Sequence, residues 1–306
     1  MFKIEIGIFL TLQLFPLLVQ AIIGGSRANP HEFPWIVQVL DKGYGYRCGG
    51  TIIAKNLVIT AAHCVTHIDK YYNSELFIYM GHSDLTSSPI KKEKVKAILI
   101  HPQYKEMRRS FDKYTQILDY NDIALLRLSK DIEFNNFVQP IALPNEGIIG
   151  DYDGLMFAAG WGFALDLKEK TNFFKNESIP FQEKDEFIQK RAGYQHNLMK
   201  LKMILSECPQ GQFLGDIGFC TAGREEPSIQ GICNGDSGSP LMTKINGRIQ
   251  IIGVASASFC YGPNNVFVNV GIFVPWIQKN LDKFVDPNYN LLSKIQARPQ
   301  SDALSM

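Results

Sequence analysis

The sequence predicts an antiparallel all-β fold, a sandwich or a barrel, on three observations. The 306-residue chain is 45% hydrophobic and 20% charged, so it can bury a core and is not globally disordered. Short runs rich in Val, Ile, Phe and Tyr recur from about residue 34 to residue 273, and Gly, Asn, Asp or Pro separates most of them. No regular alternation of strands and helices is present, which argues against a doubly wound α/β fold.

The expected strands follow one another along this region. In chain order they are Ile36–Leu40, Leu57–Thr60, Leu76–Met80, Val95–Ile100, Ile123–Leu128, Leu155–Ala159, Ile249–Ser256 and Val266–Val270. Two polar stretches, Lys105–Tyr120 and Leu165–Met199, are expected to be loops inserted between strands, and the second could hold a short surface helix.

The C-terminal region is expected to be helical and then flexible. A helix is predicted to begin near Pro275, with Trp276, Ile277 and Leu281 facing inward. Beyond Asp286 and Pro287 the chain is polar, so residues 286–306 are expected to form a flexible tail.

Residues 1–21 have the features of a secretory signal peptide. A short basic start is followed by the mostly apolar run Ile6–Val19, and Val19 and Ala21 are the small residues that a signal peptidase reads. The apolar run is shorter than the ~20 residues that span a bilayer. We therefore expect a secreted, extracellular protein that begins at Ile22 and has no membrane attachment after signal removal.

Charge and cysteine content agree with this compartment. Lys and Arg total 31 and Asp and Glu total 30, so no basic field for nucleic acid exists and no nucleic-acid partner is expected. An even number of cysteines in an exported chain favours disulfides over metal ligation, and the pairing is left open at this point. The tripeptide Asn176-Glu177-Ser178 is a glycosylation sequon, which makes Asn176 a candidate glycan site. The cysteines are Cys48, Cys64, Cys208, Cys220, Cys233 and Cys260.

Three fragments carry groups that suit nucleophilic catalysis. They are Thr60-Ala61-Ala62-His63-Cys64, Asn121-Asp122-Ile123-Ala124-Leu125-Leu126 and Gly235-Asp236-Ser237-Gly238-Ser239-Pro240. A serine hydroxyl is a poor nucleophile until an imidazole takes its proton, and a carboxylate holds that imidazole in the right tautomer. Glycines beside the serine allow a sharp turn that aims N–H groups at a developing oxyanion.

In their order and flanking residues, these fragments resemble the trypsin-like (chymotrypsin-fold) serine peptidases, from Ile22 to about Leu281. The resemblance implies two six-stranded antiparallel β-barrels with the active site in the cleft between them, and a short C-terminal helix. It places a peptidase domain at residues 22–285, with barrel subdomains at about 22–140 and 141–275.

The resemblance also assigns roles. It implies that His63 is the general base, that Asp122 orients it and that Ser237 is the nucleophile of an acyl-enzyme mechanism. The N–H groups of Gly235 and Ser237 would form the oxyanion hole, and Ser256 would hydrogen-bond the buried aspartate. The implied function is a secreted serine endopeptidase that uses no cofactor and no metal.

By the same resemblance the cysteines acquire partners. The implied disulfides are Cys48–Cys64, Cys208–Cys220 and Cys233–Cys260. A fourth bridge of the family would require cysteines at about Met156 and Thr243, and both are absent together.

The residues from Ile22 onward resemble the new N-terminus that activation creates in this family. That terminal ammonium would be buried against Asp236, because a buried charge needs a partner. Since Ala21 precedes Ile22, we expect no propeptide, and signal removal itself would yield the active terminus.

The primary specificity pocket is inferred by alignment with the family. Gly231 lies at its base, Ile232 lines it, and Ser258 and Asn265 form its walls. No carboxylate stands at the base, so an Arg or Lys side chain would be desolvated without a partner. We therefore expect an elastase- or chymotrypsin-like preference for medium or small uncharged side chains. Two departures lie nearby, since Ala257 replaces a common tryptophan and Ser239 a common glycine.

The main alternative to this interpretation is a secreted, non-catalytic peptidase homologue that acts as a protein-binding module. His63 and His67 are four residues apart, as zinc ligands can be, but Cys64 stands where the general-base glutamate would be required. Asp119 is interpreted as a solvated residue. The expected partners are protein or peptide substrates, with protein protease inhibitors as candidates, and the chain is expected to be a monomer.

Overall fold

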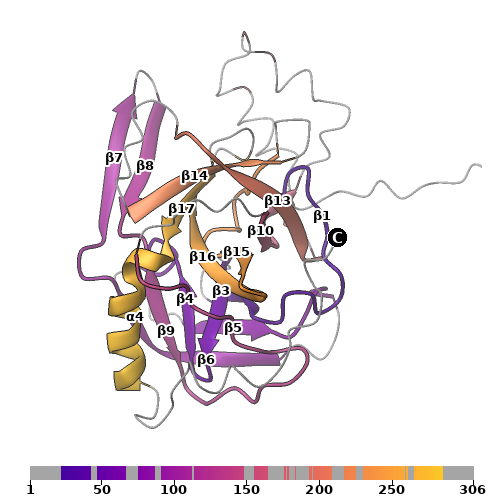
Figure 1. Ribbon diagram of the computed structural model, residues 1–306, viewed down its shortest axis with the longest axis vertical. Helices are drawn as coiled ribbons and strands as arrows, with labels where there is room; N and C mark the ends of the chain where they lie inside the picture. The colour runs from indigo at the N-terminus through magenta and orange to yellow at the C-terminus, as the bar shows by residue number, and fades with distance from the viewer. Residues whose placement is uncertain are drawn as a thin grey trace, which may run out of the picture.

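The computed structural model consists mostly of β-strands, followed by one helix near the C-terminus (Figure 1). It describes residues 22–42, 47–66, 75–86, 91–111, 114–147, 155–164, 176, 178, 183, 193–194, 196–208, 217–224, 230–258, 260 and 265–284. The expected signal peptide and the expected tail lie outside the described residues. Among the described residues, no helix combines the length and the apolar character needed to cross a bilayer.

Six strands from the first half of the chain form a closed antiparallel barrel in the order β2-β3-β4-β9-β6-β5. Its strands are rich in Val, Ile and Leu, which suit a pleated surface with a buried face. In β5, buried and half-buried positions alternate, as expected when one face points into a barrel. The strands are β2 (Ile36–Asp41), β3 (Arg47–Ala54), β4 (Leu57–Thr60), β5 (Leu76–Met80), β6 (Lys91–Ile100) and β9 (Ala124–Leu128).

A second barrel follows in the other half of the chain. Its sheet runs β1-β13-β10-β15-β16-β17-β14, and an additional pairing of β13 with β14 closes six of these strands into a ring. The predicted fold of two six-stranded antiparallel barrels and a C-terminal helix is therefore confirmed. The strands are β1 (Ser26–Arg27), β10 (Met156–Gly160), β13 (Met199–Ser206), β14 (Gly218–Gly223), β15 (Pro240–Ile245), β16 (Arg248–Ala257) and β17 (Asn265–Asn269).

The first described segment, residues 22–32, belongs with the second barrel although the first barrel follows it directly in the chain. Strand β1 pairs with β13, where Ser26 faces Lys200. Close by, the Lys200 ammonium donates to both carboxylate oxygens of Glu32, at 2.7 and 2.9 Å, and the Glu32 side chain is only 2% exposed. These contacts fix the segment that follows Ile22 against the second barrel.

Three disulfides are present: Cys48–Cys64, Cys208–Cys220 and Cys233–Cys260. They are the pairs that the resemblance implies. The two positions of the missing fourth bridge, Met156 and Thr243, are direct cross-strand partners of β10 and β15. Both are buried, so an apolar and a hydrogen-bonded side chain fill the space that a disulfide would occupy.

The C-terminal helix α4 (Val270–Phe284) begins earlier than the prediction placed it. Proline favours the first helical turn, which predicts a start near Pro275. The helix instead starts directly after β17, where the Asn269 side chain accepts a hydrogen bond from the Gly271 N–H at 3.1 Å and caps it. Ile277 and Leu281 are buried as predicted, and α4 packs on His101, whose ring lies 5.0 Å from that of Trp276.

The stretch Lys105–Tyr120 is not a loop, which corrects the prediction. It forms a two-stranded hairpin of β7 (Lys105–Phe111) and β8 (Tyr114–Tyr120), in which Glu106 faces Asp119 (Figure 1). Main-chain hydrogen bonds hold such a ribbon, and it belongs to neither barrel. Because many of its residues are polar or charged, the sequence pattern did not indicate these two strands.

The stretch Leu165–Met199 lies mostly outside the described residues. Its last residue opens β13, and β12 (Gly193–Tyr194) pairs with β11 (Phe163–Ala164), so the end of the stretch contains strand rather than loop. Asn176 is exposed, and its side chain accepts a hydrogen bond from the Ser178 N–H at 3.0 Å.

Candidate active site

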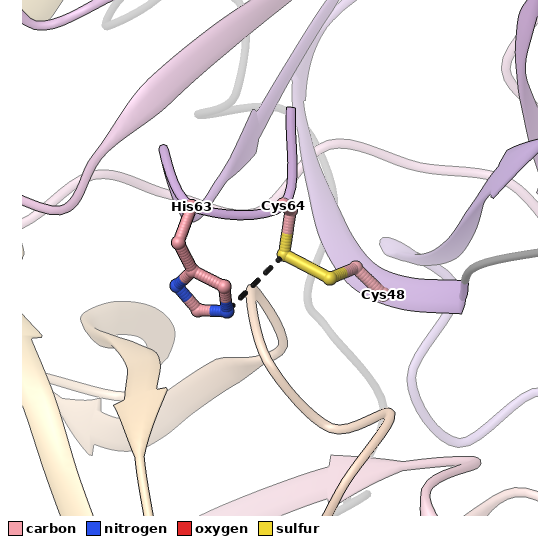
Figure 2. Close-up of side chains that lie close together, drawn as sticks. All are labelled: Cys48, His63 and Cys64. Carbon is pink, nitrogen blue, oxygen red and sulfur yellow. Dashed lines mark hydrogen bonds between the residues drawn. A yellow bond between two sulfur atoms is a disulfide. The ribbon is translucent and has the colours of Figure 1, made fainter. Parts of the chain in front are cut away.

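His63 lies in the turn that follows β4, next to a disulfide. Cys64 is bonded to Cys48 of β3, which ties this turn to the neighbouring strand (Figure 2). The Cys64 sulfur lies 3.8 Å from His63 Nε2. The imidazole is 21% exposed, so it is held by its surroundings but remains accessible.

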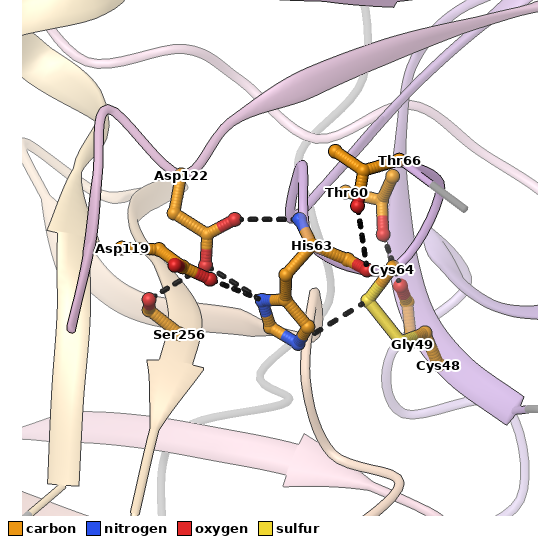
Figure 3. Close-up of a disulfide and its surroundings, with 9 residues drawn as sticks. All are labelled: Cys48, Gly49, Thr60, His63, Cys64, Thr66, Asp119, Asp122 and Ser256. Atoms are coloured by element: carbon orange, nitrogen blue, oxygen red, sulfur yellow. Dashed lines mark hydrogen bonds and ion pairs between the residues drawn. A yellow bond between two sulfur atoms is a disulfide. The ribbon is translucent and has the colours of Figure 1, made fainter. Parts of the chain in front are cut away.

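Asp122 stands between β8 and β9 and is completely buried. One carboxylate oxygen accepts a hydrogen bond from the His63 backbone N–H at 2.8 Å. The other lies 2.7 Å from His63 Nδ1 and accepts from the Ser256 hydroxyl at 2.6 Å (Figure 3). A neutral imidazole that donates from Nδ1 keeps its lone pair on Nε2, which is the tautomer a general base requires.

Opposing effects act on the charge of His63. Burial disfavours the imidazolium, but the Asp122 carboxylate favours it by its charge and its hydrogen bond, and Asp119 adds to this. The net result is that the pKa of His63 lies above its ordinary value of 6.5. The site therefore stabilises the cation that forms when the imidazole takes a proton.

The loop that carries Ser237 is held against both barrels by main-chain hydrogen bonds. The Ser237 carbonyl accepts from the Gly49 N–H of β3 at 2.7 Å, and the Gly238 N–H donates to the Ala255 carbonyl of β16 at 2.8 Å. Gly235 and Gly238 have φ angles of 95° and 80°, which L-residues rarely adopt. The glycines that flank Ser237 are therefore required by the path of the backbone.

Ser239 fits at the position where the family often has glycine. It is 2% exposed, and its φ is not in the left-handed region, so its backbone accepts a side chain. A Cβ on Gly49 would collide with the Ser239 hydroxyl, and one on Gly160 would also crowd it. Two neighbouring glycines therefore make the room for this serine.

The four residues assigned to the specificity pocket form one connected group. Asn265 is fully buried, and its side-chain oxygen accepts from the Ile232 N–H at 2.9 Å and from the Ser258 hydroxyl at 3.1 Å. A Cβ on Gly231 would lie 2.8 Å from this oxygen. The Ile232 side chain is 3% exposed and belongs to the buried cluster that includes Ile22.

Asp236 is a second fully buried carboxylate, adjacent to Ser237 in the chain. It accepts hydrogen bonds from the Gly162 N–H at 2.8 Å and the Cys233 N–H at 3.0 Å. Burial outweighs these bonds and raises the pKa of Asp236 to about 7. Ile22 is also fully buried, and the Ile23 carbonyl accepts from the Gly231 N–H, so the segment from Ile22 onward lies against this region.

Asp119 is not solvated, which corrects the prediction. Its side chain is 7% exposed, and one of its carboxylate oxygens lies 3.9 Å from His63 Nδ1 (Figure 3). The residue stands near the end of β8, so the unrecognised hairpin brings it to the imidazole. The only signal in the sequence was its position three residues before Asp122.

The side chains of His63, Asp119 and Asp122 are of metal-ligating types, and their ligand atoms lie within 4.8 Å of one another. The Asp122 oxygens already accept three hydrogen bonds, so this cluster is a hydrogen-bonded network around the imidazole. Cys48 and Cys64 lie nearby but share a disulfide, so they have no thiolate for a metal ion.

Comparisons with known proteins agree with this geometry. The family model described as Trypsin matches residues 22–277. The chain is 31% identical to the clotting factor G beta subunit of Tachypleus tridentatus over 274 residues, which covers 86% of this chain and 80% of that protein. It is 28% identical to CLIP domain-containing serine protease B4 of Anopheles gambiae (86% and 71% covered) and 27% identical to chymotrypsin-like elastase family member 1 of Rattus norvegicus (87% and 91% covered).

The contact of the Ser237 loop with β3 can be tested with two glycine variants. Gly238 and Gly247 have φ angles of 80° and 79°, but a Cβ on Gly238 would collide with Thr60 and Gly49, whereas one on Gly247 meets nothing within 4 Å. Gly247→Ala should therefore cost about 1–2 kcal/mol of unfolding free energy, from backbone strain alone. Gly238→Ala should cost at least about 2 kcal/mol more. Urea denaturation measures both, and equal costs would contradict the close approach.

Proposed function

Because the chain belongs to the trypsin family of serine peptidases, we propose that it is a secreted endopeptidase that hydrolyses peptide bonds through an acyl-enzyme. The observation that carries this proposal is the 2.7 Å contact between the buried Asp122 carboxylate and His63 Nδ1. A buried carboxylate on that nitrogen has a clear chemical use, because it prepares Nε2 to take a proton.

In the proposed reaction, the Ser237 oxygen bonds to the carbonyl carbon of the substrate as its proton passes to His63 Nε2. The carbonyl electrons move onto oxygen, and the imidazolium is paired with Asp122. When the tetrahedral intermediate collapses, the carbon–nitrogen bond breaks and His63 returns the proton to the leaving amine. Water then attacks the carbonyl carbon of the acyl-enzyme by the same steps, which releases the acid product and restores the serine hydroxyl.

The N–H groups of Gly235 and Ser237 are proposed to stabilise the oxyanion. The support is the backbone of the loop, whose φ of 95° at Gly235 is suited to glycine. A preorganised donor of this kind contributes about 2.7–4 kcal/mol of transition-state stabilisation.

We propose that the enzyme prefers medium or small uncharged side chains before the cleaved bond. The supporting observation is that none of the four residues assigned to the pocket carries a carboxylate; they are Gly231, Ile232, Ser258 and Asn265. The Asn265 oxygen is already used by the Ile232 N–H and the Ser258 hydroxyl. A guanidinium or ammonium group would therefore be desolvated there without an anionic partner.

Activation is proposed to depend on an ion pair between the Ile22 ammonium and Asp236. With residues 1–21 attached, the Ile22 nitrogen is an uncharged amide. Among the described residues, the buried Asp236 then has two backbone donors but no cationic partner. Cleavage before Ile22 creates the missing positive charge close to this region, and we propose that the signal peptidase makes that cut. Glycosylation at Asn176, secretion and a monomeric state are part of the same proposal.

Covalent labelling tests the catalytic proposal. The secreted chain should gain the mass of one fluorophosphonate group, and Ser237→Ala should gain none. Asp122→Asn should fold but lose about 10³–10⁴-fold in kcat, because it holds the wrong tautomer of His63. Intact mass and a peptide-hydrolysis assay give both results. A folded chain that begins at Ile22 and is not labelled would favour the non-catalytic, protein-binding alternative.

A library of peptides tests the specificity. Substrates with Ala, Val, Leu or Phe before the cleaved bond should have kcat/KM values at least about tenfold higher than those with Arg or Lys, a difference of about 1.4 kcal/mol. The sequenced cleavage products give the preference directly. Preferred cleavage after Arg or Lys would contradict the proposed pocket but leave the catalytic groups unaffected.

Denaturation at several pH values tests the activation pair. The pKa of Asp236 is raised from 3.8 to about 7 in the chain that retains residues 1–21. The stabilisation of its protonated form is therefore complete below about pH 4 and is lost as the pH rises through about 7, by up to about 4 kcal/mol.

A chain that begins at Ile22 should escape most of this loss, because its ammonium pairs with the ionised carboxylate. Urea unfolding of the two forms between pH 4 and 8 measures the difference. Asp236→Asn, which removes the titrating group, serves as the control in both forms. Parallel pH profiles for the two forms would rule out the proposed pair.

A further inference from the structure

Asp119 is a buried carboxylate beside the imidazole that the mechanism above does not use. One of its oxygens lies 3.9 Å from His63 Nδ1, on the side of the ring where Asp122 already binds. Asp122 follows the turn after β8, whereas Asp119 belongs to the hairpin itself, so two structural elements bring negative charge to one nitrogen (Figure 3).

The described neighbours of Asp119 compensate only part of the cost of burying its carboxylate. One of its oxygens is buried and accepts no hydrogen bond, and among the residues whose side chains the structure describes, no Lys or Arg pairs with it. The Tyr104 hydroxyl donates to the carboxylate, while Glu106 faces it across the hairpin with the same charge. A buried carboxylate is costly without a cation, and the His63 ring is the group that can become one.

We propose that Asp119 is a positioning residue that acts through His63, stabilising the imidazolium that forms when Ser237 attacks, and that Tyr104 holds its carboxylate in place. This proposal rests on the proposed peptidase function. It assigns no contact with substrate to Asp119. The hairpin β7–β8 thereby becomes a part of the active site that supplies charge.

The arrangement has a distinctive consequence for pH dependence. Burial and the charge of Asp122 raise the pKa of Asp119 to about 6, whereas His63 and the Tyr104 hydrogen bond act in the opposite direction. Because each group shifts the pKa of the other, Asp119 and His63 titrate as a coupled pair. A proton on Asp119 removes part of the charge that favours the imidazolium, so a fraction of the enzyme keeps a neutral His63 at lower pH.

The test is the pH profile of kcat/KM between pH 5 and 9 for the mature enzyme with a neutral peptide substrate. We expect the acidic limb of the wild type to be broader than a one-proton curve. Asp119→Asn should convert it to a one-proton curve shifted to lower pH, because the imidazolium loses a favourable charge. Glu106→Gln, which removes a carboxylate from the facing strand position, is the matched control and should keep the broad limb.

Tyr104→Phe is a second variant that leaves the carboxylate in place. Without the hydroxyl, Asp119 binds its proton more readily, so the acidic limb should move to lower pH by less than in Asp119→Asn. A profile of Asp119→Asn that keeps the wild-type midpoint while kcat/KM falls uniformly would overturn the proposal, as would a change confined to KM, which would mean substrate binding.

A nitrogen-detected NMR titration of the His63 ring in a Ser237→Ala background separates this proposal from the peptidase function. If the wild type hydrolyses no peptide but Asp119→Asn still lowers the titration midpoint of His63, the proposed function fails and the action of Asp119 on His63 stands. If the midpoint is the same with and without Asp119, the proposal is overturned whatever the activity. The spectra also report whether each variant is folded.

Discussion

The buried carboxylate of Asp122 is the contact on which the rest of the site depends. It accepts hydrogen bonds from the backbone and the ring of His63 in the first barrel and from the Ser256 hydroxyl of the second. A charge without solvent access is stable only when such donors surround it, so the buried position of the Asp122 carboxylate depends on donors from both barrels. The contact that joins the two barrels is therefore also the contact that orients the His63 imidazole.

The loop that carries Ser237 is placed by a different kind of force, namely close approach of main chain to main chain. Gly238 and Gly49 allow the loop to lie on β3, and Gly160 and Gly162 leave space for the Asp236 carboxylate. Side chains at these positions would push the loop away from β3 and crowd the Asp236 carboxylate. The disulfides Cys48–Cys64 and Cys233–Cys260 tie the histidine turn and this loop to neighbouring segments, so both reactive groups stand on supported backbone.

Charge is distributed unevenly around the imidazole. The Asp122 carboxylate is the closer of the two to His63 Nδ1 and is hydrogen-bonded to it. The Asp119 carboxylate is a second source of negative charge, and its pKa is raised. Asp236 is buried, precedes Ser237 in the chain and is held by backbone donors. The three carboxylates thus differ in what surrounds them, and these surroundings separate their roles although their chemistry is the same.

The sequence by itself determined the fragments around His63, Asp122 and Ser237, the all-β pattern and most strands of the first barrel, because each of these is written in neighbouring residues. Only the tertiary structure decided the hairpin over Lys105–Tyr120, the start of α4 at Val270 and the burial of Asp119. Main-chain hydrogen bonds between two strands with many polar residues form the hairpin, and the Asn269 cap sets the start of the helix. Asp119 lies next to His63, which is far away in the chain. Local patterns report which face of a strand is apolar, but which polar groups meet depends on how the two barrels and the hairpin pack.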